Sequence, residues 1–265
     1  MLKPITSLTN QSVKDIRALH MRKEREASGR FLAEGLKIII DALDQGHAPR
    51  ILVCGPEGSN GRHPMLERAI AETLAAKGEV LEVTREILEK ISRKDNPQMV
   101  MAVFDQMARG LDDIDPRSAD VWVALEQVRD PGNLGTIIRT ADAAGVGGVI
   151  LIGDCVDPFS VETVRATMGS IFALPIVRCT REAFLAKRAI WTGAVVGTLL
   201  TATHNHRTAD YRRPTLLLMG TEQSGLTPEL AAICDTNVKI PMRGRADSLN
   251  LSVATGIMIY AAQGL

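Results

Sequence analysis

Aromatic side chains are scarce in this chain of 265 residues, in which Phe, Trp and Tyr together make up 3%. So few rings argue against a binding surface built mainly on base stacking. No apolar run approaches the ~20 residues that a membrane-spanning helix needs. The charged N-terminus also lacks the apolar stretch of a secretory signal. We therefore expect a cytoplasmic protein without a membrane segment.

Sequence signals for metal and nucleotide chemistry are equally sparse. The cysteines have no CxxC spacing, which predicts reduced thiols in the core: Cys54, Cys155, Cys179 and Cys234. His204 and His206 lie in a polar stretch, so we expect exposed side chains there and no metal site. The chain contains neither GxxxxGK[ST] nor GxSxG, so a P-loop ATPase and a serine hydrolase have no support.

The composition favours a folded protein with more than one part. It is 45% hydrophobic, and its 31 basic and 31 acidic side chains cancel. We predict a basic helical extension over residues 1–30, where seven basic side chains face three acidic ones, and a small α/β unit over 31–104. Residues 105–118 are rich in Asp and read as an acidic linker. In residues 119–265, strand-like and helix-like segments alternate, which predicts a parallel sheet covered by helices.

Three polar stretches interrupt the apolar second half. In the first, Asn133 could cap a helix, and Arg139 stands among Ile137, Ile138 and Ala141. A charged side chain among apolar residues usually either forms a structural ion pair or takes part in function, and the sequence alone does not decide between these two roles for Arg139.

The other two stretches follow predicted strands. Glu222 comes after a buried strand that ends at Gly220, where an open parallel sheet would place a ligand. An ordinary strand-to-helix turn is the competing interpretation. In the third stretch, Ser248 or Asn250 could simply cap the last helix.

Taken together, these stretches resemble the three motifs of the SpoU family of ribose 2'-O-methyltransferases. That family belongs to the SPOUT superfamily of S-adenosylmethionine-dependent RNA methyltransferases. The matching segments are NLGTIIRTADAAGV, LLLMGTEQSGL and IPMRGRADSLNLSVATGIMIYAA. The resemblance covers about residues 119–265. On RFLAEG and the pattern after it, the 31–104 unit resembles the L30e-like substrate-binding domain of many bacterial rRNA members.

The resemblance implies an α/β fold whose C-terminal SPOUT parallel-sheet domain carries a trefoil knot. It also implies a homodimer, with the active site near the subunit interface, and S-adenosylmethionine as cofactor, with no metal. Structured RNA would be the substrate, 23S rRNA being favoured over tRNA, and the N-terminal parts would dock it. The implied catalytic residues are Arg139, Asn133, Glu222, Asn250 and Ser248. Because an arginine has a pKa above ~12, we favour phosphate binding and alkoxide stabilisation for Arg139 over a role as base.

Relatives hold the adenosine at positions that correspond here to Gly220, Ile240 and Leu249, with Met242 and Thr198 as neighbours. One departure is Thr221, where many relatives carry Asn before the Glu. Threonine keeps a hydroxyl but loses the amide, and we expect the reaction class to be unchanged.

Other functions compete with this prediction. A nicotinamide-dependent oxidoreductase would suit an open sheet, but the glycine fingerprint is missing. A non-catalytic RNA-binding or ribosome-assembly module would not need four polar site residues. Within the family, a tRNA ribose methyltransferase and an antibiotic-resistance enzyme acting on 23S rRNA both stay open, and the sequence does not indicate the modified base.

Overall fold

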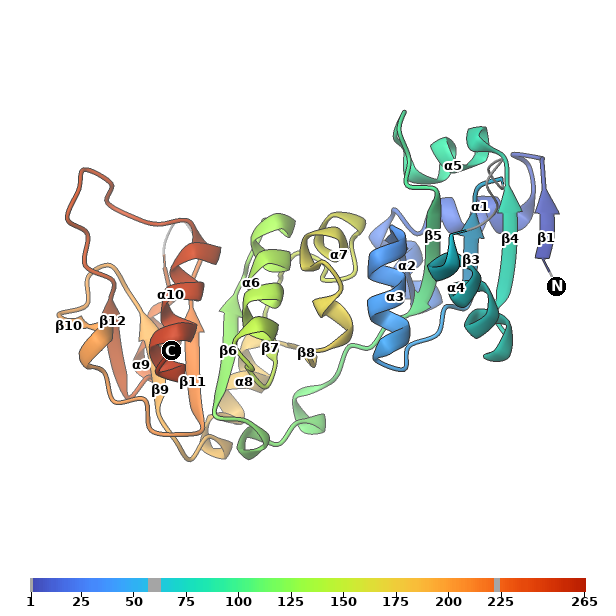
Figure 1. Cartoon of the computed structure of the whole chain (residues 1–265). Coiled ribbons are helices and arrows are strands. Elements are labelled where there is room, and N and C mark those ends of the chain that lie inside the picture. The colour runs from blue at the N-terminus through green and yellow to red at the C-terminus, as the bar shows by residue number, and fades with distance from the viewer. Residues whose placement is uncertain (1, 57–62, 222–224) are drawn as a thin grey trace. The chain divides into compact units, whose positions relative to one another are not determined.

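The computed structural model describes residues 2–56, 63–221 and 225–265. The chain folds as two compact units, each of which combines helices with one sheet, so the α/β class is confirmed (Figure 1). Unit 1 contains Met1–Gln106 and Phe159–Phe172; unit 2 contains Met107–Pro158 and Ala173–Leu265. Among the helices of the described residues, none is long and apolar enough to cross a membrane.

Unit 1 is built on a five-stranded sheet in the order β1-β4-β3-β5-β2, in which only β5 runs antiparallel to its neighbours. Its strands are β1 Leu2–Ile5, β2 Arg30–Glu34, β3 Ile51–Cys54, β4 Glu79–Val83 and β5 Val100–Asp105. Its helices are α1 Gln11–Ala18, α2 Arg22–Ser28, α3 Leu36–Asp44, α4 Pro64–Ala75, α5 Arg85–Ser92 and α7 Val161–Thr167. Apolar side chains of α1 and α5, among them Ile16 and Ile91, pack with strand residues in a core.

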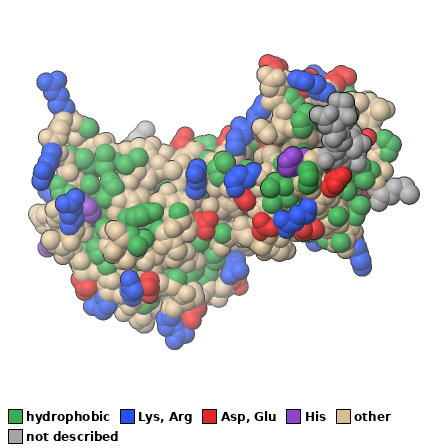
Figure 2. Space-filling view, in the orientation of Figure 1, with side chains coloured by type: hydrophobic (Ala, Val, Ile, Leu, Met, Phe, Trp, Pro, Cys, Tyr) green, Lys and Arg blue, Asp and Glu red, His purple; other side chains and the backbone are tan. Residues whose placement is uncertain are grey.

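The expected N-terminal extension is built into this unit. Strand β1 adds to the sheet beside β4, and α1 contributes to the core. Several of the basic side chains are used locally: Arg25 is buried and donates to the Leu19 carbonyl, and Lys3 pairs with Glu79. Figure 2 shows acidic side chains interspersed with the basic ones on this face of the molecule. Fewer basic side chains of residues 1–30 are therefore available to a polyanion than their number in the sequence indicates.

Helix α7 lies within the range predicted for the catalytic domain, yet it packs in unit 1. The cause is an aromatic cluster: Phe159 and Phe172 flank α7, and their ring centroids lie 5.0 and 5.9 Å from that of Phe31. Val161 joins the core. Local sequence does not reveal such a long-range contact.

A buried ion pair also holds α7 to β2. The Glu34 carboxylate, with a side chain 1% exposed, accepts hydrogen bonds from Lys94 and Arg165, each at 2.5 Å. Both bonds go to Oε2, while the buried Oε1 has no partner among the described residues. Burial raises the pKa of the Glu34 carboxyl, and Arg165 only partly opposes this.

We expect Glu34→Gln to change how stability depends on pH. A carboxyl with a raised pKa binds protons more tightly in the folded state, so stability falls as pH rises from about 4.3 through the folded value. The amide does not titrate, and the variant should gain stability relative to wild type across that window. Urea denaturation of both proteins at about pH 4.5 and about pH 7 measures this difference. Parallel pH trends would contradict the prediction.

Unit 2 is built on a seven-stranded parallel sheet in the order β10-β12-β9-β11-β6-β7-β8. Its strands are β6 Val121–Glu126, β7 Val149–Ile152, β8 Ile176–Cys179, β9 Val195–Thr198, β10 His204–Asn205, β11 Thr215–Met219 and β12 Thr236–Lys239. Its helices are α6 Pro131–Ala143, α8 Arg181–Ala186, α9 Pro228–Ala232 and α10 Leu251–Gln263. The buried strands are almost wholly apolar, as expected for a sheet covered on both faces.

Helices cover the two faces of this sheet in pairs. Phe184 of α8 and Leu230 of α9 belong to the same buried apolar cluster as Leu216 and Leu218 of β11. On the other face, α10 packs against α6, β11 and β6 (Figure 1). The two helices run in the same direction, because α10 begins beside the start of α6, and Gln263 near its end donates to the Ala144 carbonyl at 2.9 Å.

Several local expectations differ from the structure. Part of the expected acidic linker is packed in unit 2, where Leu111 is buried and the Pro116 carbonyl accepts a bond from the Trp122 indole. His206 lies in a 3-10 turn and is buried, not exposed as predicted. This burial lowers the pKa of its imidazole ring. The four cysteines form no disulfide with one another, but Cys179 and Cys234 are only partly buried.

Candidate functional site

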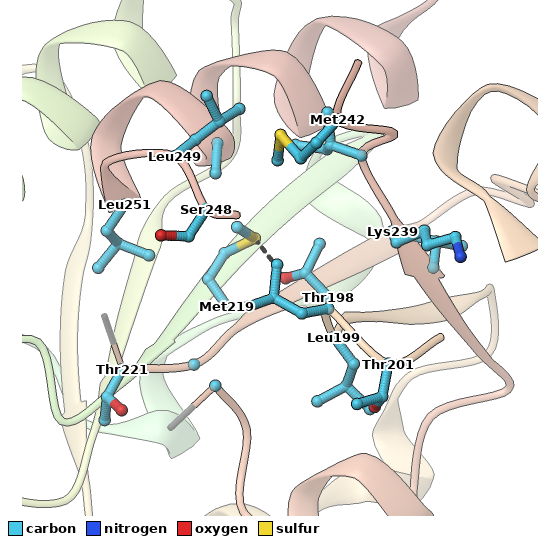
Figure 3. A pocket seen from close by; sticks show the side chains of 16 residues that line it. Thr198, Leu199, Thr201, Met219, Thr221, Lys239, Met242, Ser248, Leu249 and Leu251 are labelled. Carbon is cyan, nitrogen blue, oxygen red and sulfur yellow. Dashed lines mark hydrogen bonds between the residues drawn. The ribbon is translucent and has the colours of Figure 1, made fainter. Parts of the chain in front are cut away.

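A pocket of about 250 Å³ opens at the carboxyl ends of β9, β11 and β12 (Figure 3). This is the edge of a parallel sheet at which backbone N–H and C=O groups end their ladder and can face a ligand. The lining is mostly apolar. It consists of Thr198, Leu199, Leu200, Thr201, Met219, Gly220, Thr221, Gly225, Val238, Lys239, Ile240, Met242, Ser248, Leu249, Leu251 and Ala254.

Gly220, Thr221 and Gly225, which follow β11, form one wall of the pocket. Thr221 and Gly225 exchange backbone hydrogen bonds of 3.0 and 3.1 Å. A Cβ atom on Gly220 would lie 1.9 Å from the carbonyl carbon of Gly225, so no larger residue fits there. Gly225 itself has a φ of +69°, in the left-handed region that favours glycine. These glycines thus let the backbone itself form the wall.

The segment between β12 and α10 forms the opposite wall. Met242 and Leu249 line the pocket from this segment (Figure 3). Asn250 ends it as the cap of α10, its Oδ1 accepting bonds from the backbone of Ser252 and Val253 at 2.9 and 3.3 Å. Capping by Asn250 was one of the two alternatives that the sequence left open.

All the residues predicted at the cofactor site line this one pocket: Thr198, Gly220, Ile240, Met242 and Leu249. The Thr198 hydroxyl is already engaged, since it donates to the Leu218 carbonyl at 2.9 Å and lies 3.0 Å from the Met219 sulfur. Residues of the first turns of α10, Leu251 and Ala254, were missed. Their spacing of three, on the helix that follows the third motif, is the signal that would have found them.

The predicted catalytic residues gather only in part. Asn250 Nδ2 donates to Asn133 Oδ1 at 2.8 Å, so the starts of α10 and α6 are joined by a side-chain pair. Ser248 lines the pocket. Asn133 is not the cap of α6, because Asp130 takes that role and accepts a bond from the Asn133 backbone at 2.6 Å. Glu222 lies outside the described residues.

Arg139 stands apart from the pocket on the exposed face of α6. It forms no hydrogen bond or ion pair with any residue that the structure describes, so the structural ion pair considered from the sequence has no support there. An unpaired guanidinium is available for an anion from outside the chain.

A buried network holds the end of the Gly220–Gly225 loop. Glu126, with a side chain 1% exposed, ends β6 and accepts bonds from Arg181 Nη2 and from the Thr227 backbone N–H, both at 2.9 Å. Arg181 Nε and the Thr227 hydroxyl are buried without partners among the described residues. Thr227 follows the loop by two residues, so Glu126 fixes where that wall ends.

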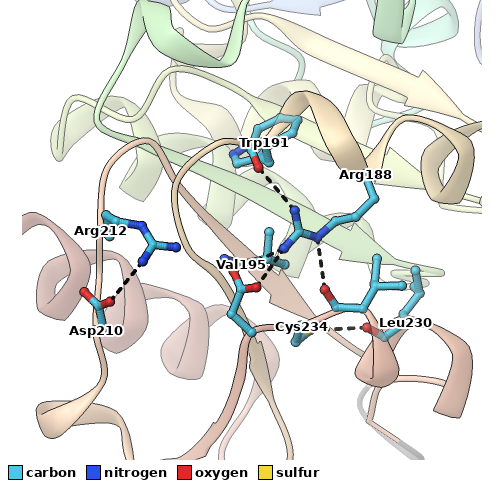
Figure 4. Close-up of polar contacts among 9 residues, drawn as sticks. Arg188, Trp191, Val195, Asp210, Arg212, Leu230 and Cys234 are labelled. Carbon is cyan, nitrogen blue, oxygen red and sulfur yellow. Dashed lines mark hydrogen bonds and ion pairs between the residues drawn. The ribbon is translucent and has the colours of Figure 1, made fainter.

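A second network lies at the opposite, amino ends of β9 and β12 (Figure 4). Arg188 bonds both carboxylate oxygens of Asp235 at 3.1 Å and the carbonyls of Trp191 and Ile233 at 3.2 and 3.0 Å. Asp235 in turn accepts from the Val195 backbone at 2.8 Å. This network ties the strands together away from the pocket.

Comparison with known proteins bears on both units. The model of the SpoU rRNA methylase family matches residues 120–260, and that of the MRM3-like substrate binding domain matches residues 10–102. The 23S rRNA (guanosine(2553)-2'-O)-methyltransferase RlmP of Bacillus subtilis is 31% identical over 99% of this chain and 100% of its own.

Solved structures agree with this similarity. An AdoMet-bound rRNA methyltransferase from Sinorhizobium meliloti is 52% identical with a TM-score of 0.90, and the match covers 99% of this chain and 98% of the other. The SpoU methyltransferase AviRb from Streptomyces viridochromogenes, in complex with AdoMet, is 31% identical with a TM-score of 0.83, covering 96% and 97%.

Proposed function

The chain belongs to the SpoU rRNA methylase family, and we propose that it transfers a methyl group from S-adenosylmethionine to a ribose 2'-hydroxyl of 23S rRNA. One observation carries the proposal: every position that the motifs predict for the cofactor lines a single pocket at the carboxyl edge of the sheet. RlmP, whose name gives an rRNA position, and the AdoMet-bound Sinorhizobium meliloti enzyme both match nearly the whole chain.

The pocket suits the adenosine part of this cofactor. Its volume of about 250 Å³ is close to the lower end of small-molecule sites, roughly 300 Å³. Ile240, Met242 and Leu249 offer apolar surface for a flat ring, and the strand end at Gly220 offers backbone polar groups. When bound, S-adenosylmethionine supplies a methyl group activated by a positively charged sulfur.

The remaining residues act on the RNA. We assign to Arg139 the binding of a phosphate beside the target ribose and the stabilisation of the developing alkoxide at its 2'-oxygen. The Asn133–Asn250 pair orients the ribose, and Ser248 contacts the RNA or the cofactor at the pocket rim. To Glu222, which lies outside the described residues, we assign a role in the polar surroundings of the reacting nucleotide.

A homodimer explains why Arg139 stands away from the pocket. Beside α6, helix α10 exposes Val253 and Tyr260 by 51% and 42%, although the helix is apolar around most of its circumference. Such a face is typical of an interface. We propose that a second copy of this chain covers it and brings Arg139 near the partner's pocket. We also propose that unit 2 carries the trefoil knot and that the protein is cytoplasmic.

Two substitutions at Asn250 separate its structural role from its part in the reaction. Asn250→Ala removes the helix cap and should lower the free energy of unfolding by about 1 kcal/mol. Asn250→Asp keeps the cap oxygen and should leave stability nearly unchanged, but it removes the N–H donated to Asn133. We expect both variants to transfer methyl groups about tenfold more slowly, the equivalent of one hydrogen bond. A full rate in Asn250→Asp would remove the pair from the mechanism.

The proposed function is tested by incubating the protein and labelled S-adenosylmethionine with total rRNA and total tRNA from cells that lack the gene. Nucleoside mass spectrometry then identifies the product. A new 2'-O-methyl nucleoside in 23S rRNA is the expected result and also identifies the base. Methylation of tRNA alone would show that the substrate is tRNA and not 23S rRNA. Absence of cofactor binding would favour a non-catalytic RNA-binding module instead.

A further inference from the structure

Two arginines lie in the segment that joins β12 to α10. Arg243 and Arg245 are both exposed, on a stretch whose two ends line the cofactor pocket through Met242 and Ser248. Arg243 follows Met242 directly. Arg245 is three residues from each end, so its Cα lies at most about 11 Å from theirs. The segment therefore presents two cations at the rim of the pocket.

These arginines differ from most others in unit 2. Neither forms a hydrogen bond or ion pair with a residue that the structure describes, although Asp247 is close in sequence. Six of the other ten arginines of the unit are paired with carboxylates: Arg117 with Asp115, Arg129 with Asp154, Arg181 with Glu126, Arg188 with Asp235, Arg212 with Asp210 and Arg213 with Asp120. The rim arginines thus keep their donors free.

The surroundings leave room for a large ligand. A Cβ atom on Gly244, between the two arginines, would meet nothing within 4 Å. Figure 2 shows Lys and Arg side chains projecting from the end of unit 2 where this segment runs in Figure 1. A polyanion can therefore reach both guanidinium groups from the solvent.

We propose that Arg243 and Arg245 bind RNA phosphates next to the methylated nucleotide, an inference that rests on the proposed function. A ribose whose 2'-hydroxyl reaches the pocket carries phosphates on both sides, and these must pass over its rim. A guanidinium binds a phosphate through two parallel N–H donors, which fixes position as well as adding affinity. The two arginines thus hold the strand in register over the pocket without reading its bases.

The carboxylate of S-adenosylmethionine is the other anion that could reach this rim. The two assignments predict different losses. Phosphate contacts weaken RNA binding and reduce its dependence on salt when they are removed, whereas loss of a carboxylate contact weakens cofactor binding and leaves RNA affinity as it was.

The experiment compares Arg243→Ala, Arg245→Ala and the double variant with wild type. Arg109→Ala is the matched control, because the Arg109 side chain is also exposed and has no partner among the described residues, while its backbone pairs beside β8 at the other edge of the sheet. RNA affinity is measured without cofactor on a 23S rRNA transcript over a range of salt concentrations. Cofactor affinity is measured separately by calorimetry, and thermal melting verifies that each variant is folded.

We expect the double variant to bind the transcript about tenfold more weakly, with a salt slope reduced by about 0.7 for each arginine lost. Its cofactor affinity should match that of wild type, and Arg243→Lys with Arg245→Lys should recover part of the binding. Unchanged RNA affinity and slope, or a loss confined to cofactor binding, would overturn the inference. If wild type binds the transcript but methylates no RNA, the proposed function fails, whatever the arginine variants do.

Discussion

Arg139→Ala is expected to lower methyl transfer by about 10²–10³-fold, the usual effect of removing one group that stabilises a developing oxyanion. S-adenosylmethionine should bind with nearly its wild-type affinity, because Arg139 does not line the pocket. Stability should also be unchanged, since the side chain is exposed and has no partner among the described residues. Single-turnover transfer rates and calorimetric cofactor titrations measure the two effects.

Two further variants make the Arg139 experiment specific. Arg139→Lys keeps the charge but loses the two-pronged donor geometry, so it should recover only part of the rate. Arg109→Ala removes a guanidinium that is also exposed but lies beside β8 at the far edge of the sheet, and it should transfer at the wild-type rate. A full rate in Arg139→Ala would exclude this residue from the reaction. If Arg139→Ala lost as much affinity for S-adenosylmethionine as it lost rate, Arg139 would have a role in cofactor binding instead.

Much of the cofactor pocket followed from motifs placed on a simple topology. Parallel strands end at one edge of a sheet, so polar or glycine-rich sequence after Met219 and Lys239 must gather there. The alternation of apolar strands and helices over residues 119–265 predicted a ligand beyond Gly220, whereas the assignment of Ile240, Leu249, Met242 and Thr198 to the cofactor came from the resemblance to the SpoU motifs. Asn250 was also accessible to local reasoning, because an Asn before an apolar helix is a common cap.

Other features depend on contacts that no local pattern contains. Helix α7 follows its aromatic neighbours into unit 1, because Phe159 packs on Phe31, more than a hundred positions away. Glu126 reads as the last residue of a strand, and only the fold brings Arg181 and Thr227 to its carboxylate.

Glu126→Ala is expected to lower both stability and cofactor affinity. Removing one member of a buried ion pair costs about 3–5 kcal/mol, and the lower end applies here because Arg181 keeps a contact with Glu229 at 3.3 Å. The loss also frees the Thr227 N–H, and with it the end of the loop that forms one pocket wall. We expect about a tenfold weaker affinity for S-adenosylmethionine, equivalent to about 1.4 kcal/mol.

The effect on the pocket must be separated from destabilisation alone. Arg188→Met breaks the network at the amino ends of β9 and β12, so it should lower stability by about 2 kcal/mol while cofactor affinity stays at the wild-type value. Glu126→Gln keeps an acceptor for the Thr227 N–H but loses the charge facing Arg181. Its free energy of unfolding should therefore fall more than its affinity for S-adenosylmethionine. Urea denaturation and calorimetry on the three variants give both quantities. If Arg188→Met weakened cofactor binding as much as Glu126→Ala, the loss would reflect general loosening of unit 2, and Glu126 would have no specific part in shaping the pocket.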